Sequence, residues 1–148
     1  MPQQRKNIQF RVYPESVYGF WFDCTIYRTA KHLRKAVKNR GGNPTNDGVR
    51  GIVQHFRVIR NGRYTKQLGH IHLCESDLSA EVLSHESAHA ALNWADHMKI
   101  NVRDQTPDKT GFGMSEDSGE ERFAYALGRI CSQLSHQVWE HDLVAIPE

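Results

Sequence analysis

The five residues His85-Glu86-Ser87-Ala88-His89 constrain this chain more than any other feature of its sequence. In an α-helix, residues four positions apart lie about 40° apart around the axis, so both imidazoles can bind one ion. The intervening glutamate points to the side, where it reaches a metal-bound water without being a ligand itself. The pattern therefore predicts a helix that carries a hydrolytic Zn²⁺ site.

The flanking sequence favours that helix. The stretch from Leu78 to Met98 contains no glycine or proline and is rich in helix-forming residues. Asp77 is a suitable N-cap residue. We therefore predict a helix from about Leu78 to Met98 with the two histidines in its middle. The alternative interpretation is an ordinary core helix with two incidental histidines.

The length and polarity of the chain indicate a globular protein. Its 148 residues are enough for a domain with its own core, so we predict a single domain over residues 1–148. No run of 18 apolar residues exists, and residues 1–11 lack the apolar segment of a secretion signal. We therefore predict a cytoplasmic protein without a membrane span, in which the three cysteines are reduced thiols.

The charge is distributed unevenly along the chain. Residues 1–66 hold 14 Lys and Arg against 3 Asp and Glu, whereas residues 67–148 hold 5 against 14. The two halves can pack as complementary faces, or the basic half can contact nucleic acid or an acidic partner. The acidic half can instead surround a cationic site. The simplest alternative is a solvated surface on which charges of opposite sign partly neutralise each other.

Hydrophobic periodicity predicts an α+β fold, with an antiparallel sheet packed against the helix of the histidine motif and a following C-terminal helix. The Asn61-Gly62 dipeptide between two of the predicted strands is a strong hairpin signal. The polar stretch from Asn101 to Gly119 is long for a loop, which favours a lid or substrate-binding segment. The predicted strands are Ile8–Val12, Phe20–Tyr27, Ile52–Ile59 and Tyr64–Leu73, and the other predicted helices run from Thr29 to about Arg40 and from about Glu120 to His136.

A catalytic zinc ion typically needs a third protein ligand. The extended motif that places this ligand just after the second histidine is excluded, because the positions that would be glycine and histidine are Leu92 and Ala95. His97 lies on the same predicted helix but about 80° from His89, so it cannot converge on the same ion. The third ligand must therefore come from another element.

The histidine motif followed 32 positions later by Glu121-x-x-Ala124 resembles the gluzincin branch of the zincin metallopeptidases. The chain is most similar to their small forms, many of them encoded by phages and mobile elements, and the resemblance covers roughly residues 64–135. It implies a zincin-like fold, a zinc site of His85, His89 and Glu121, and cleavage of peptide bonds in the host cytoplasm if a phage encodes the chain.

The residues leave the choice of the carboxylate open. Glu121 shares a helix stripe with the small residues Ala124 and Gly128, which would let two helices approach closely. Glu120 lies nearer the apolar face of the same helix. However, Ser118-Gly119-Glu120-Glu121 is also a capping-box signature, in which Glu121 would only contact the backbone of Ser118. Glu120, or neither glutamate, remains an alternative to Glu121.

The expected reaction is hydrolysis by a zinc-activated water with Glu86 as general base. Glu86 would take a proton from the water and return it to the leaving amine. A donor to the developing oxyanion is also needed, and Tyr125, His97 and His136 are the candidates. The resemblance further implies that an edge strand before the active helix holds the substrate, and Leu68–Leu73 is the segment we expect in that role.

Other functions remain open at this stage. A zincin-like binding module, with a structural metal or none, would grip nucleic acid or a host protein through the basic half. Trp21, Tyr27 and Tyr64 lie among the basic residues there, a combination that suits single-stranded nucleic acid. His70 and His72 share one face of a predicted strand and could bind a metal, although such a pair is more often structural.

Overall fold

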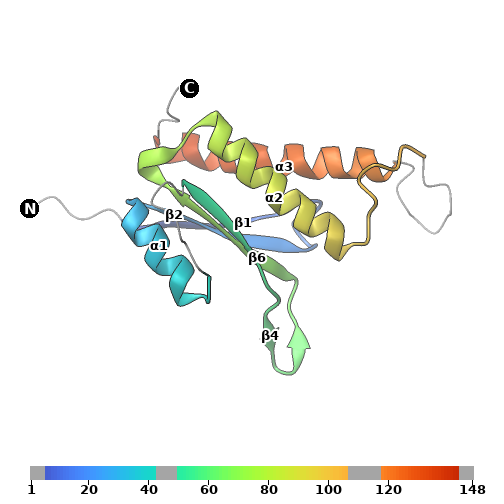
Figure 1. The fold of residues 1–148 in the computed structure, drawn as a ribbon, viewed down its shortest axis with the longest axis horizontal. Coiled ribbons are helices and arrows are strands. Elements are labelled where there is room, and N and C mark those ends of the chain that lie inside the picture. The colour runs from blue at the N-terminus through green and yellow to red at the C-terminus, as the bar shows by residue number, and fades with distance from the viewer. Residues whose placement is uncertain (1–5, 43–49, 107–117, 144–148) are drawn as a thin grey trace, which may run out of the picture.

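The computed structural model describes residues 6–42, 50–106 and 118–143. They form an α+β structure in which a sheet lies between helices (Figure 1). Helices α2 and α3 cover one face of the sheet and α1 lies on the other (Figure 1). The elements are β1 (Ile8–Val12), β2 (Trp21–Tyr27), α1 (Ala30–Asn39), β3 (Gly51–His55), β4 (Ile59–Arg60), β5 (Arg63–Tyr64), β6 (Gln67–Cys74), the 3-10 turn η1 (Glu75–Asp77), α2 (Ala80–His97) and α3 (Gly119–Glu140).

The main sheet has the order β1-β2-β6-β3 and is mixed. Strand β2 pairs with β6 in parallel, whereas the other two pairs are antiparallel. The prediction of an antiparallel sheet was therefore wrong in one pair. The reason is burial: all eight residues of β6 are buried. A strand buried on both faces takes a central place, and here it separates β2 from β3.

The same position overturns the predicted role of Leu68–Leu73 as a substrate-binding edge. Both edges of β6 are already paired, one with β2 and the other with β3. Its backbone groups are therefore occupied along the strand. Strand β3 is the outermost strand on this side of the sheet, and among the described residues no strand pairs with its outer edge.

The main core lies between the sheet and the pair α2 and α3. Its largest buried side chains include Phe22 and Ile71 from the sheet, Trp94 from α2 and Ile130 from α3. A smaller cluster joins α1 to the other face through Leu33 and Val37. The apolar residues of both faces thus hold one sheet between two layers of helices.

The face of β6 that points toward α1 carries two buried histidines. The Nε2 atom of His70 hydrogen-bonds to Oγ1 of Thr25 at 2.8 Å. The Nδ1 atom of His72 lies 2.8 Å from the Tyr27 hydroxyl and its Nε2 lies 2.7 Å from Oε1 of Gln54. Burial lowers the pKa of His70 to about 4 and that of His72 to about 3, with smaller contributions from neighbouring positive charges. Both rings are therefore neutral, hydrogen-bonded parts of the sheet.

Local sequence signals account for several element ends. Thr29 caps α1 by accepting a hydrogen bond from the backbone N–H of His32, as predicted. Gly41 has a φ of +83° just after the helix, a conformation that favours glycine. Asn61 and Gly62 have φ angles of 53° and 74°, which are typical of the tight turn predicted between β4 and β5.

The predicted cap of the histidine helix was wrong. Asp77 belongs to η1, and the side chain of Ser79 accepts the hydrogen bond from Val82 N–H instead. The C-terminal helix extends to Glu140, one turn beyond the prediction, because Val138 continues its buried stripe. None of the helices in the described part of the chain combines the length and apolar character that crossing a bilayer requires.

The buried contact between Tyr27 and His72 gives a stability prediction. We expect Tyr27→Phe to lower the free energy of unfolding by about 1–3 kcal/mol, because it leaves a buried imidazole nitrogen without its partner. Chemical denaturation followed by circular dichroism measures the change. Tyr18→Phe makes the same chemical change at a side chain that is 84% exposed, and it should alter stability by less than about 0.5 kcal/mol. Equal effects of the two variants would show that the buried contact contributes nothing.

Candidate metal centre

The histidine motif lies in the middle of α2, whose ends are well defined. Ser79 caps the start, and the backbone N–H of Ile100 bonds to the carbonyl of Ala95 past the end, where Lys99 has a φ of 57°. The helix buries one broad face against the sheet and α3. His85 and His89 lie on the exposed side of α2 and Glu86 lies on the buried side.

The two imidazoles converge on one point. The Nε2 atoms of His85 and His89 lie 3.1 Å apart, and the ring planes meet at 74°. A zinc ion bound to both nitrogens at about 2.0–2.1 Å in tetrahedral geometry would separate them by about 3.3 Å. The pair therefore fits the first two positions of a zinc site, with only a small adjustment.

Glu86 is held beside this pair and away from water. Its side chain is almost fully buried, and its Oε1 lies 4.0 Å from Nε2 of His85. Burial raises the pKa of Glu86, and the nearby His85 partly opposes that shift. A carboxylate with a raised pKa takes up a proton more readily near neutral pH, which suits a general base.

Gly51 at the start of β3 makes room for that carboxylate. A Cβ atom built on Gly51 would lie 2.9 Å from Cγ and 3.2 Å from Cδ of Glu86. The absence of a side chain here lets the edge strand pack directly against Glu86. Sequence reasoning missed this residue, because Gly51 directly precedes the predicted strand Ile52–Ile59 and its contact with Glu86 exists only in the folded chain.

The structure does not bring Glu121 together with the histidines. In the described ranges, no three His, Cys, Asp or Glu side chains form a group able to hold a metal ion. Glu121 is exposed, and its backbone N–H bonds to the Ser118 side chain in a cap. Glu120 is also exposed and accepts a hydrogen bond from Gln105 at 3.2 Å.

The side of α2 on which α3 packs explains why Glu121 does not meet the histidines. Leu83 of α2 shares a hollow with residues of α3, and the guanidinium of Arg122 lies 5.9 Å from the ring of Trp94. At about 100° per residue, Leu83 and Trp94 lie on nearly the same side of α2, whereas His85 lies about 160° away. The helix that carries Glu121 is thus on the opposite flank from the histidines.

The stripe of small residues on α3, which we expected to pack closely against another helix, faces outward. Ala124 and Gly128 are exposed, and a Cβ on Gly128 would meet nothing within 4 Å. The expectation that these small residues bring α3 against α2 was wrong. The inward side of α3 is instead formed by larger residues, including Ile130 and Leu134.

The three candidate oxyanion donors lie in different places. Tyr125 is 55% exposed on the outer side of α3. His136, also exposed on α3, lies 3.6 Å from Glu140. His97 ends α2, where its ring meets Phe20 edge-on at 4.7 Å between centroids and Arg57 lies within 3.4 Å. Residues 107–117 of the predicted lid lie outside the described residues.

Comparison with known proteins adds no family to this description. No family model, curated protein or solved structure matches the chain. The interpretation of the site therefore depends on the geometry of His85, Glu86 and His89 and on the resemblance of their motif.

Burial of the Glu86 charge gives a prediction about stability. With chelator present, we expect Glu86→Gln to raise the free energy of unfolding at neutral pH by about 1 kcal/mol. Burial of the neutral amide costs less free energy than burial of the carboxylate. Thermal and chemical unfolding measure this change. Glu81→Gln removes an exposed charge from the first turn of the same helix and should not stabilise the protein. A loss of stability in Glu86→Gln would show that the carboxylate has favourable partners in the folded protein.

Proposed function

We propose that this protein is a zinc-dependent metallopeptidase with a zincin-like fold. The observation that supports the proposal best is the convergence of two imidazole nitrogens, 3.1 Å apart, next to a buried glutamate. Two histidines one turn apart lie close together on any helix, and what distinguishes this pair is the buried carboxylate of Glu86 beside it. In this proposal, His85 and His89 hold the metal and Glu86 is the general base.

A zinc ion bound there would supply Lewis acidity and would bring the pKa of a bound water to about 7. The protein's own contribution is the movement of the proton. Glu86 accepts it during attack on the peptide carbonyl and then delivers it to the leaving amine. The raised pKa of the buried carboxyl supports both transfers, since the group must be able to take and release a proton near neutral pH.

The outer edge of β3 is the place we propose for the peptide substrate. Gly51 of this strand touches Glu86, so a peptide paired with the strand would pass beside the general base. An extended peptide bound in this way would gain backbone hydrogen bonds from an edge that no described strand occupies. Strand β3 thus replaces Leu68–Leu73 in the role first given to that segment.

The second candidate function is a zincin-like binding module in which the metal is structural or absent. The excess of Lys and Arg in residues 1–66 favours this alternative, because it suits an anionic partner. The two functions differ in what Glu86 does. A binding module does not need the carboxylate of Glu86, whereas a peptidase depends on it.

The first test separates metal binding from catalysis. We expect about one zinc ion per chain by elemental analysis, lost in His85→Ala and kept in Glu86→Gln. Cleavage of a peptide library should fall by about 100-fold or more in Glu86→Gln, because proton transfer is lost. Glu81→Gln, on the same helix, is the matched control and should cleave normally. Unchanged cleavage in Glu86→Gln would contradict the peptidase and favour the binding module.

Gly51→Ala adds a test of the position of the carboxylate. The new methyl group would displace the flexible Glu86 side chain without a backbone clash, so zinc content should persist while cleavage falls. Normal cleavage in Gly51→Ala would show that contact with β3 is not required.

The third ligand is tested by a matched pair of variants. The resemblance names Glu121, with Glu120 as its alternative, and both side chains are exposed on α3. Because neither forms a metal-holding group with the histidines, we expect Glu121→Gln and Glu120→Gln to keep far more zinc than His85→Ala. Competition with a chelating dye measures the affinities. A loss confined to Glu121→Gln would instead support the ligand that the resemblance names.

A further inference from the structure

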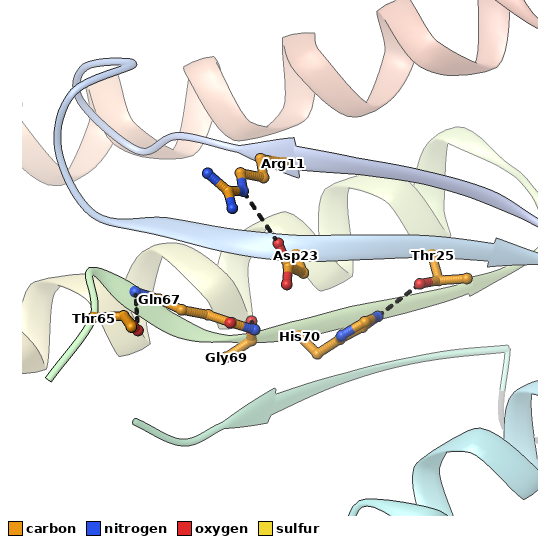
Figure 2. A network of polar contacts seen from close by, with 7 residues as sticks. All are labelled: Arg11, Asp23, Thr25, Thr65, Gln67, Gly69 and His70. Atoms are coloured by element: carbon orange, nitrogen blue, oxygen red, sulfur yellow. Dashed lines mark hydrogen bonds and ion pairs between the residues drawn. The ribbon is translucent and has the colours of Figure 1, made fainter. Parts of the chain in front are cut away.

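The face of the sheet opposite the metal centre carries a polar hollow. Its volume is ≈ 380 Å³, and its lining reaches from the strands to Arg40 at the end of α1. Six polar side chains of its lining come from β1, β2 and β6: Gln9, Arg11, Asp23, Thr25, Gln67 and His70. Figure 2 shows five of them gathered across the three strands. The proposed peptidase does not use any of these residues.

The floor of the hollow is polar yet buried and rigid. Thr25 is 2% exposed and His70 is 5% exposed, and the two side chains hydrogen-bond to each other. Gln67 is 7% exposed and donates its amide to the carbonyl of Gly69 at 3.2 Å. Buried polar side chains that are fixed by hydrogen bonds within the protein form a preformed surface for a ligand that makes hydrogen bonds.

The rim of the hollow is positively charged. Arg11 lies 3.7 Å from Asp23, which neutralises part of its charge. Arg40 at the end of α1 donates to the carbonyl of Ala36 and has no ion pair among the described residues. The guanidinium of Arg40 is close enough to help lower the pKa of His70 in the floor. The hollow thus combines hydrogen-bonding groups below with an excess positive charge above.

Helix α1 adds positive charge on its outer side, because Lys31, Lys35 and Lys38 lie roughly opposite the buried Leu33 and Val37. This helix contains four basic residues and no acidic ones, and Lys31, Lys35 and Lys38 are exposed. Helix α2 on the other face of the sheet contains three acidic residues and no Lys or Arg. The two helices on opposite faces of the sheet therefore differ in charge. An anionic polymer would be attracted to α1 more than to α2.

We propose that this hollow and the basic side of α1 bind single-stranded nucleic acid, with one nucleotide seated in the hollow. The phosphates would lie along Arg40 and the lysines of α1, and one base would meet the amides of Gln9 and Gln67. Phe56 adds an aromatic wall to the same hollow. A single strand is the form that fits, because only unpaired bases can enter a pocket and meet its hydrogen-bonding groups.

Fluorescence anisotropy with a labelled 20-nucleotide single strand tests the proposal at several salt concentrations. We expect binding that weakens steeply with salt. Arg40→Gln should weaken binding about tenfold. It should also reduce the slope of log affinity against log salt concentration by the amount expected for about one phosphate contact. Arg103→Gln is the matched control, since Arg103 is exposed just past α2, away from α1, and it should bind normally. No binding at low salt, or equal losses in both variants, would overturn the proposal.

A second variant separates the hollow from general attraction between charges. Gln9→Trp keeps the charge and places a bulky ring at the hollow from an exposed position on β1, so binding should fall about tenfold. Circular dichroism confirms that the variant is folded. Undiminished binding in a folded Gln9→Trp would overturn the role of the hollow.

A duplex of the same sequence should bind more weakly than the single strand, and tighter binding of the duplex would also overturn the proposal.

Competition by free thymidine monophosphate tests whether the ligand is a nucleic-acid strand or a single nucleotide. The free nucleotide should compete only at concentrations far above those of the oligonucleotide, since it lacks the phosphates that follow α1. Competition at equal concentrations would overturn the assignment to a strand. Binding should also be unchanged in Glu86→Gln, so this test and the test of the peptidase can fail separately.

Discussion

Burial of β6 on both faces is the constraint from which the rest of this structure follows. All eight of its residues are buried, so the strand can only lie in the middle of the sheet. That position gives β3 the outer edge and places Gly51 against Glu86 of α2. It also requires partners for two buried histidines, which the neighbouring strands supply through Thr25, Tyr27 and Gln54. The site and the polar face thus depend on one central strand.

Several features of the fold could be predicted because their causes are local. The hairpin turn at Asn61-Gly62 needs positive φ angles, which these two residues adopt readily. Thr29 caps α1 through a contact three residues away. The convergence of His85 and His89 follows from the helical repeat alone. Each of these signals involves residues within four positions of one another, so no knowledge of tertiary packing is needed.

The features that could not be predicted are set by packing between distant elements. Helical spacing shows that His85 and His89 share a face, but it does not show on which flank of α2 the next helix packs. Leu83 and Trp94 face α3, and that choice leaves Glu121 on the far side from the histidines. In the same way, the sequence of Tyr64–Leu73 indicates a strand but not whether that strand lies at the centre or the edge of the sheet. Gly51 was missed because its role exists only once β3 meets Glu86.

The two faces of the sheet divide the chemistry of the molecule. On one side, an acidic helix carries the histidine pair and its buried carboxylate. On the other, a basic helix borders a polar hollow. Strand β6 contributes to both sides, since Ile71 joins the core beneath α2 while His70 forms the floor of the hollow. Strand β6 is paired along both of its edges and separates the two faces. A nucleic acid held on one face would therefore leave the edge of β3 and the histidine pair open to a peptide.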